Sequence, residues 1–226
     1  MDPIAHIHTD LPEKFGIPRQ SGVITELKGY ITFEPEYRDM NALVGLQDFS
    51  HIWILWEFED VKKDKFVPMV RPPRLGGNKK LGVFATRSPF RPNPIGLSCV
   101  KLEWIKDSED GPVICVSGVD MRDNTPIYDI KPYIPYADCK PDAVGGFTDK
   151  TEYEKLIVAG GTEHLDILRD EADRTAVVKI LENDPRPHYH DDPDRVYGFL
   201  YGKHNINFRV DGSNVFIVRV ERFCEQ

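Results

Sequence analysis

Between residues 23 and 121 the sequence contains a succession of short strand-like segments, with no helical pattern between them long enough to connect parallel strands. Parallel neighbours need a crossover of a dozen or more residues, usually a helix, so a doubly wound sheet is disfavoured. Successive short strands instead favour an antiparallel barrel or sandwich. We expect a short helix at residues 37–46. The expected strands are residues 23–33, 49–60, 81–86, 95–105 and 113–121.

The clearest of these strands lies within residues 49–60. Residues 52–56 are continuously apolar, a pattern that predicts burial on both faces of a strand. Such a strand needs cover on both sides.

The character of the chain changes near Lys140. Residues 141–150 have loop composition, and helical patterns follow at residues 151–159 and 164–182. Prolines then end the second helix. Strands are expected at residues 196–201, 206–210 and 215–223, with a hairpin turn at Asp211-Gly212. We therefore expect a β-rich domain over residues 1–140 and a small α+β domain over residues 141–226.

Composition excludes several classes of protein. The 226 residues are 40% hydrophobic and 29% charged, as in a globular domain, and no apolar run approaches the ~18 residues of a membrane helix. The N-terminus has neither the basic start nor the apolar core of a secretory signal. The four cysteines form no CxxC pair and have no histidines at zinc-ligand spacing, so we expect reduced thiols in the cytoplasm and no metal site.

Several nucleotide-binding and hydrolytic motifs are absent from the sequence. It has no GxGxxG after a strand, no GxSxG and no HExxH. Residues 77–82 have the glycine spacing of a P-loop, but Val83 stands where the lysine is required.

The charge distribution is uneven. The chain carries a net charge of −8, whereas residues 65–106 contain nine Lys and Arg and a single acid, Glu103. A local basic surface on an acidic protein suits one focused anionic ligand, although a solvated charged loop is the plain alternative.

Two arginine-proline segments lie in this basic region, VRPPRLGG at residues 70–77 and ATRSPFRPNPIGL at residues 85–97. Proline restricts φ, so these loops are stiff and lose little entropy on binding a ligand. Arg87, Arg91 and Asn93 are their candidate binding residues, because an arginine fork matches a carboxylate or phosphate. The alternative is a rigid structural crossover.

A third polar segment, DMRDNTPIYDIKPYIPYAD, occupies residues 120–138. It supplies polar groups at a sheet rim and tyrosines that could stack on a base. Asp123-Asn124-Thr125-Pro126 could equally be only a β-turn. The polar candidates are Asp123, Asn124, Thr125 and Asp129, and the aromatic ones are Tyr128, Tyr133 and Tyr136.

Two shorter segments complete the candidates. PRQSG, at residues 18–22, is an extended polar stretch before the first expected strand. DPRPHYH, at residues 184–190, offers Arg186, His188, Tyr189 and His190 for contact with RNA, or is an ordinary surface loop.

Together these segments resemble the TrmO family, also called TsaA-like or YaeB-like proteins. The resemblance rests on PRQSG, FSHIWIL, VRPPRLGG, GVFATRSPFRPNPIGLS, DNTPIYDIKPYIP and DPRPHYH, which span almost the whole chain. It implies a single-sheet antiparallel β-barrel with a small C-terminal domain, assembled as a homodimer. It also implies an S-adenosylmethionine-dependent methyltransferase that acts on N6 of threonylcarbamoyl-adenosine beside the anticodon of tRNA, notably threonine tRNA.

The resemblance also implies cofactor contacts, which we carry over residue by residue. They fall on the 18–20 segment, the end of the buried strand, the arginine-proline loop and the 123–126 turn. The cofactor residues are Pro18, Arg19, Gln20, Phe58, Glu59, Arg87, Leu97, Asp123, Asn124, Thr125 and Pro126.

Methylation of this N6 needs a proton acceptor, because the nitrogen lies between a purine and a carbonyl and still carries a proton. Asp129 and Asp123 are the candidate bases, with His51 as runner-up, and Arg91 is the candidate partner of the substrate's threonine carboxylate. Asn93, Tyr133 and Arg186 are further candidate substrate contacts. Two other interpretations stay open: methylation of a small nucleoside or metabolite, and a non-catalytic module that binds S-adenosylmethionine or RNA.

Overall fold

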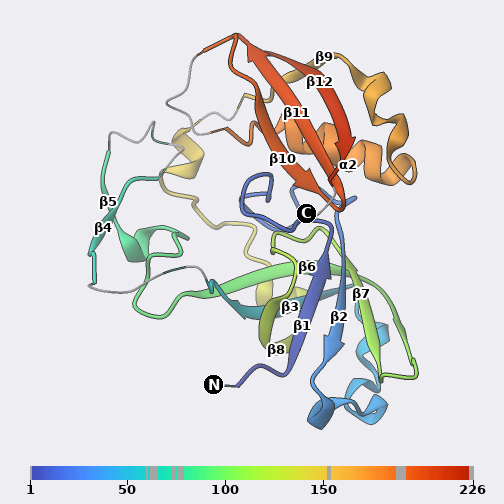
Figure 1. The fold of residues 1–226 in the computed structure, drawn as a ribbon. Helices are drawn as coiled ribbons and strands as arrows, with labels where there is room; N and C mark the ends of the chain where they lie inside the picture. The colour runs from blue at the N-terminus through green and yellow to red at the C-terminus, as the bar shows by residue number, and fades with distance from the viewer. Residues whose placement is uncertain are drawn as a thin grey trace.

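The computed structural model describes residues 2–59, 61, 66–72, 75, 79–151, 154–186 and 192–223. Six strands close into a barrel in the order β1-β2-β7-β6-β3-β8, and every pairing is antiparallel (Figure 1). The expected mainly β fold with an antiparallel barrel is confirmed. The barrel strands are β1 (Ala5–Thr9), β2 (Lys28–Phe33), β3 (His51–Glu57), β6 (Ile95–Lys106), β7 (Val113–Ser117) and β8 (Thr125–Pro132).

The barrel interior explains the apolar strand β3. Ile52, Ile54 and Trp56 are buried, whereas the residues that alternate with them are only half-buried. The prediction that this strand is buried on both faces is therefore wrong for a single chain, because a barrel strand has one interior and one exterior face. On the exterior, Trp53 Nε1 donates a 3.0 Å hydrogen bond to Asp138, and its ring lies 5.8 Å from that of Tyr133.

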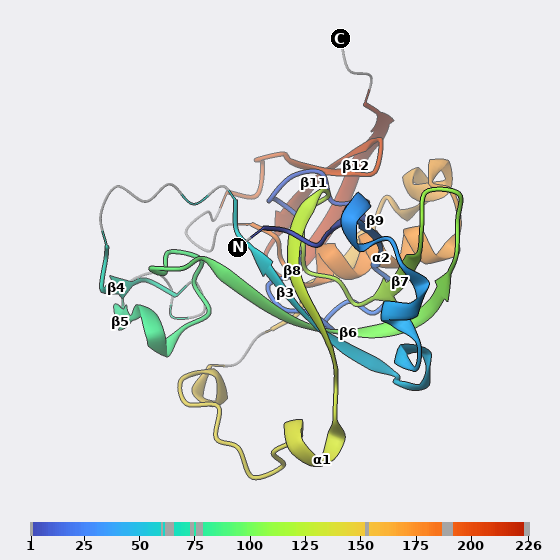
Figure 2. The ribbon, with the colours of Figure 1, turned by 90° about the horizontal axis from the view of Figure 1, so that it is seen from below.

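Short elements join the barrel strands. A two-stranded sheet, β4 with β5, projects from the side of the barrel between β3 and β6 (Figures 1 and 2). The helix expected at residues 37–46 is instead a run of 3-10 turns, and residues 23–27 form turns rather than strand. These short elements are η1 (Pro35–Tyr37), η2 (Met40–Leu43), η3 (Leu46–Asp48), β4 (Met69–Val70), β5 (Leu81–Gly82), η5 (Val83–Ala85), α1 (Pro135–Asp138) and η6 (Thr148–Lys150).

The C-terminal part is a four-stranded sheet, ordered β10-β11-β12-β9, with one helix, α2 (Figure 1). β9 pairs parallel to β12, and the expected hairpin at Asp211-Gly212 joins β11 to β12. The buried face of α2 consists of Ala176, Val177, Ile180 and Leu181, with Asp173. The elements are β9 (Ile157–Gly160), η7 (Thr162–Ile167), α2 (Glu171–Glu182), β10 (Tyr197–Tyr201), β11 (His204–Asp211) and β12 (Asn214–Arg222).

Two helix predictions in this part are wrong. Residues 157–160, expected within a helix, form β9 at the sheet edge. The helix expected over residues 164–182 begins only at Glu171, because the Asp170 carboxylate accepts the Asp173 N–H at 3.0 Å and caps the helix there.

The barrel and the C-terminal sheet share one hydrophobic core. At their junction the backbone N–H of Leu200 donates to Glu13 Oε1 at 2.8 Å, and Lys179 forms an ion pair with Glu26. The proposed domain boundary near residue 140 lies between α1 and β9.

Candidate active site

The predicted cofactor segments meet where β3 ends and β6 begins. The backbone N–H of Phe58 donates to the Pro94 carbonyl at 2.9 Å, which fastens the arginine-proline loop to the end of β3. The Phe58 ring lies 4.2 Å from that of Trp56. Leu97, near the start of β6, is 54% exposed on the outside of the barrel.

The PRQSG segment contacts the arginine-proline loop directly. Arg87 Nη1 donates a hydrogen bond to Gln20 Oε1, and the next residue, Ser21, accepts from the backbone N–H of Cys99 at 3.1 Å. Pro18 is buried, whereas Arg19 and Arg87 are exposed. Two segments 67 residues apart in sequence thus supply one polar surface beside Leu97.

A buried polar chain underlies this surface. Trp56 Nε1 donates to Ser98 Oγ at 2.9 Å, and Ser98 Oγ donates to Asp120 Oδ1 at 2.6 Å. Burial raises the pKa of Asp120 to about 6, against the lowering effects of the Ser98 hydrogen bond, a backbone hydrogen bond from Ser21 and the charge of Arg87. Asp120 is not among the predicted site residues, because its hydrogen bond to Ser98 comes from tertiary structure and the DNTP motif three residues later pointed to Asp123 instead.

Asp123 and Asn124 form a tight turn, closed by the Thr125 N–H donating to the Arg122 carbonyl at 3.3 Å, and Thr125 and Pro126 begin β8. Asn124 has a φ of +62°, and Asp123 Oδ1 accepts the backbone N–H of Thr9 at 3.0 Å. Arg122 Nη2 lies 3.3 Å from Glu59 Oε2, which brings the turn to the same end of β3. Contact of these residues with a cofactor stays a prediction, as does the alternative that they form only a turn.

Asp129 lies on the exterior of the barrel in a row with Leu97. Leu55 of β3 pairs with Asp129 on one side and with Leu97 on the other, so roughly 10 Å of sheet separates the two outer residues. Asp129 is part-exposed and forms a 2.6 Å ion pair with Lys131.

His51 and Tyr133 lie farther along the same face. The Tyr133 N–H donates to the His51 carbonyl at 3.0 Å, and their rings are 6.2 Å apart. His51 is four residues from Leu55 along β3, roughly 13 Å. Asp129 is therefore nearer than His51 to the Leu97 end.

The Arg91 side chain stabilises its own loop through hydrogen bonds to backbone carbonyls. Its Nη1 donates to the carbonyls of Thr86, at 2.8 Å, and Ser88, at 3.4 Å, and its guanidinium lies 5.9 Å from the centre of the Phe84 ring. Asn93 is exposed two residues later.

Arg186 is not brought to this surface by any contact that the structure describes. Its side chain is only 11% exposed, and Nε and Nη2 form a bidentate pair with Asp184 at 2.8 and 3.0 Å. The Asp184 carboxylate raises the pKa of Arg186, so this guanidinium stays charged and paired. The neighbouring candidates His188, Tyr189 and His190 lie outside the described residues, as do several residues of the 70–77 segment.

Within the described ranges, no group of three His, Cys, Asp or Glu side chains could hold a metal ion. No helix of the described part is long and apolar enough to span a membrane.

Comparison with known proteins agrees with the resemblance. The model of the tRNA-methyltransferase O N-terminal domain matches residues 6–139, and that of the TrmO C-terminal domain matches residues 164–223. The chain belongs to the TrmO family. The family prediction is therefore confirmed.

Two relatives in this family are tRNA (adenine(37)-N6)-methyltransferases by name. The one from Escherichia coli (strain K12) is 35% identical over 96% of both chains, and the one from Eikenella corrodens is 44% identical over 76% of this chain and 97% of its own. The crystal structure of TrmO from Pseudomonas aeruginosa superposes with a TM-score of 0.76 and 31% identity, covering 97% of both chains.

Proposed function

We propose that this TrmO-family chain is an S-adenosylmethionine-dependent methyltransferase that acts on N6 of adenine 37 in tRNA. The names of its relatives support the reaction, and the contact of Gln20 with Arg87 beside Leu97 is the structural observation that carries the cofactor site. It assembles the segments that the resemblance assigns to the cofactor.

The chemistry of this surface fits S-adenosylmethionine. Arg87 offers donors for the carboxylate of the cofactor, and Leu97 offers an exposed apolar side chain for the adenine ring. The buried Asp120 carboxylate adds negative charge beneath a ligand that is a sulfonium cation. When bound, the cofactor supplies an electrophilic methyl group, and the protein's task is to align it with the acceptor nitrogen.

The acceptor that we favour is threonylcarbamoyl-adenosine, notably in threonine tRNA. Asp129 is the preferred base, because its row with Leu55 and Leu97 places it near the cofactor surface. Asp123 is less suited, since one carboxylate oxygen already accepts the Thr9 N–H. The guanidinium nitrogens of Arg91 other than Nη1 donate to the threonine carboxylate of the substrate. Asn93 and Tyr133 are further substrate contacts.

We propose a homodimer as the working form, in the cytoplasm where tRNA is modified. Large apolar side chains are exposed on η5 and on the arginine-proline loop that follows β5, among them Phe84 at 72% and Phe90 at 61%. A second copy would cover these side chains. Light scattering should give twice the mass of one chain at micromolar concentration.

A non-catalytic cofactor-binding module is the second candidate. A relative from Pyrococcus abyssi, 34% identical over 67% of this chain, carries the name probable S-adenosyl-L-methionine-binding protein. The deciding measurement is mass spectrometry of tRNA nucleosides from cells with and without the gene, combined with methyl transfer in vitro. Loss of the N6-methylated nucleoside on deletion supports the enzyme, and cofactor binding without turnover on tRNA would support the module.

A further inference from the structure

A cavity of about 530 Å³ lies where the barrel meets the C-terminal sheet, and none of the candidate active-site residues lines it. It is bounded by the chain after β1, the segment before α2, the β10–β11 turn and the end of β12. Its charged and hydroxyl side chains include Asp10, Arg169, Asp173, Tyr201, Lys203 and Arg222.

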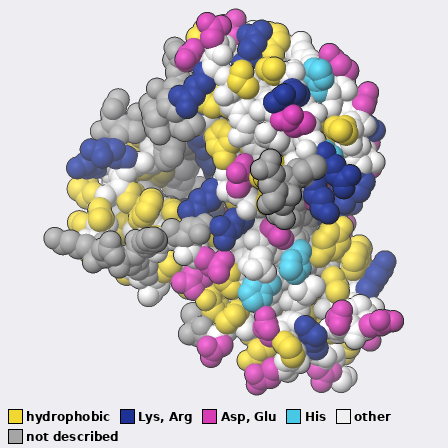
Figure 3. All heavy atoms as spheres, viewed as in Figure 1, with side chains coloured by type: hydrophobic (Ala, Val, Ile, Leu, Met, Phe, Trp, Pro, Cys, Tyr) yellow, Lys and Arg dark blue, Asp and Glu magenta, His cyan; other side chains and the backbone are white. Residues whose placement is uncertain are grey.

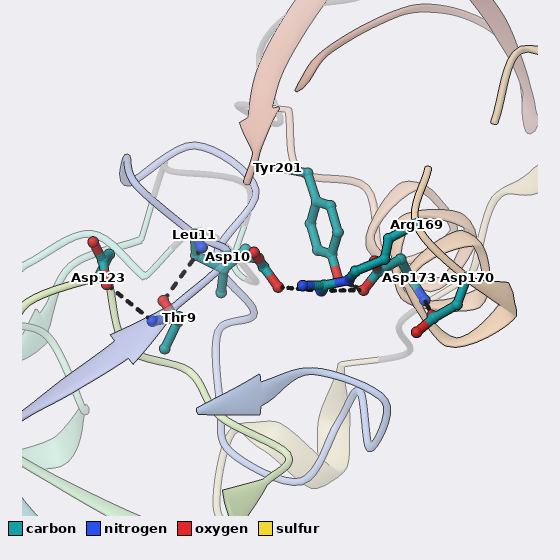
Figure 4. A network of polar contacts seen from close by, with 8 residues as sticks. All are labelled: Thr9, Asp10, Leu11, Asp123, Arg169, Asp170, Asp173 and Tyr201. Atoms are coloured by element: carbon teal, nitrogen blue, oxygen red, sulfur yellow. Dashed lines mark hydrogen bonds and ion pairs between the residues drawn. The ribbon is translucent and has the colours of Figure 1, made fainter. Parts of the chain in front are cut away.

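The acids of this cavity are already satisfied. Arg169 donates to Asp173 through Nε at 2.9 Å and Nη2 at 3.1 Å, and Nη2 also reaches Asp10 at 3.1 Å (Figure 4). The Tyr201 hydroxyl donates to Asp173 at 3.0 Å, and burial with the nearby Asp173 charge raises the pKa of Tyr201. Both carboxylates are thus hydrogen-bonded and Arg169 is held in place, although one guanidinium offsets only one of the two negative charges.

Lys203 and Arg222 differ from the paired side chains of the cavity. Both are exposed, and within the part of the chain that the structure describes neither has an ion pair or a side-chain hydrogen bond. Arg222 pairs in register with His204, and the Phe223 N–H donates to the Lys203 carbonyl at 2.7 Å, so the two cations lie on adjoining strand ends. Figure 3 shows several Lys and Arg side chains on one face of the molecule, interspersed with acidic and hydrophobic side chains.

Most other cations of the C-terminal part are engaged, and the exposed Lys150 and Lys155 lie outside the cavity. Arg174, Lys179, Arg186 and Arg219 pair with acids, and Arg195 and Arg209 lie over aromatic rings. On a chain of net charge −8, exposed and unpaired cations beside a rigid Arg169 form a local positive site.

The cavity adjoins the candidate active site through β1. Thr9 donates its N–H to Asp123 of the 123–126 turn, and the next residue, Asp10, lines the cavity (Figure 4). One extended ligand could therefore contact both sides of this strand end.

We propose that Lys203 and Arg222 bind a backbone phosphate of tRNA at this cavity, with Arg169 as its fixed floor. The inference rests on the proposed tRNA substrate, and it identifies a second place where the protein binds the RNA, outside the methyl-transfer site. Two exposed cations beside a fixed guanidinium suit the oxygens of a phosphodiester, since all three side chains only donate hydrogen bonds.

The test is the salt dependence of tRNA binding by the full chain carrying both Lys203→Ala and Arg222→Ala. Each lost phosphate contact removes about 0.7–0.9 from the slope of log K against log salt, and because both side chains contact the same phosphate we expect a change of about 0.7–0.9. Affinity near 0.1 M salt should fall on the order of tenfold or more. The KM for tRNA should rise while kcat at saturating tRNA and the cofactor affinity stay unchanged.

The matched control removes two other exposed lysines, Lys150 and Lys155, neither of which lines the cavity. Lys155 precedes β9, which pairs with the start of β12, and Arg222 stands at the other end of β12. This control should keep the wild-type slope. An unchanged slope in the Lys203/Arg222 variant, while the wild type binds tRNA, overturns the inference.

Two further outcomes separate the inference from the proposed function. Wild-type protein that neither binds nor methylates tRNA would remove the proposed function, and the inference with it. Inorganic phosphate that binds the wild type but not the variant, with tRNA affinity equal in both, would overturn the inference in favour of a small-anion site. A charge-reversed variant, Lys203→Glu with Arg222→Glu, should weaken tRNA binding further, and unchanged thermal unfolding of these exposed-site variants excludes misfolding as the cause.

Discussion

Ser98 Oγ donates a 2.6 Å hydrogen bond to Asp120 Oδ1, and thereby ties the first strand segment after the arginine-proline loop to the residues that precede the 123–126 turn. The same hydroxyl accepts from Trp56 in the barrel interior. The outer surface beside Leu97 is thus supported from within by a buried carboxylate.

This carboxylate predicts a pH dependence. The pKa of Asp120 is about 6 in the folded chain, above its ordinary value of 3.8, so the folded state binds more protons between these values. The free energy of unfolding should therefore fall as the pH rises from 4 to 6, by on the order of 1–3 kcal/mol. Asp120→Asn should lack this contribution, which urea unfolding at a series of pH values would measure. Identical pH profiles for both proteins would contradict the assignment.

The same residue should influence cofactor affinity. If the ionised Asp120 supports a sulfonium ligand, binding of S-adenosylmethionine by the wild type should weaken as the pH falls below about 6. Calorimetry should show that Asp120→Asn binds S-adenosylmethionine more weakly than the wild type, and that its affinity depends less on pH. S-adenosylhomocysteine, which lacks the positive sulfur, is the control ligand and should show less of the effect.

Cofactor binding should also stabilise the protein. A ligand that binds only the folded state adds about 2.7 kcal/mol at 100 times its dissociation constant. Thermal unfolding with and without S-adenosylmethionine measures this shift, and Arg87→Ala should reduce it by removing the contact with Gln20. No shift at millimolar cofactor would count against the methyltransferase assignment.

Gly96 should be intolerant of a side chain. A Cβ at this position would lie 2.2 Å from Trp56 Cε2, inside the barrel, whereas a Cβ on Gly82 would meet nothing within 4 Å. Gly96→Ala should cost about 1–3 kcal/mol or more through overpacking. Gly82→Ala is the matched control and should change stability by less than about 0.5 kcal/mol. Equal unfolding midpoints for the two variants would show that Trp56 can move aside.

The strand pattern predicted an antiparallel barrel or sandwich, because strands such as β6 and those of the β11–β12 hairpin show local alternation, and the family resemblance pointed to the barrel. The strand pattern did not predict β8 as a strand, since Pro126, Asp129 and Pro132 are poor strand residues that pairing with β1 and β3 nevertheless holds in place. β9 was assigned to a helix because four residues carry little periodicity, and only the parallel pairing with β12 decides their conformation.

The site was predictable to a similar degree. Motif resemblance gave Gln20 and Arg87, which the structure brings into contact. Pairing partners were not predictable, because they come from tertiary structure. Examples are the ion pair between Asp184 and Arg186 and the hydrogen-bonded chain that joins Trp56 and Ser98 to Asp120.

Arg91 distinguishes the donor site from the acceptor site. If it binds the threonine carboxylate of the substrate, Arg91→Ala should lower kcat/KM for tRNA on the order of 10²-fold or more, through loss of a charge-assisted contact. The stiff prolines alone suggest that cofactor affinity would be untouched. However, Arg91 Nη1 also holds the Thr86 carbonyl, one residue before Arg87, so a small loss of cofactor affinity is expected as well.

Arg91→Lys separates these two effects, because an ammonium can keep a single donor to Thr86 but cannot form a bidentate fork. This variant should retain near-normal cofactor affinity by calorimetry and still methylate tRNA poorly, whereas Arg87→Ala should lose cofactor affinity directly. If Arg91→Lys loses cofactor binding as severely as Arg87→Ala, both arginines belong to the donor site. The threonine carboxylate would then need another partner, and Lys131, which forms an ion pair with Asp129 on β8, is the cation to test.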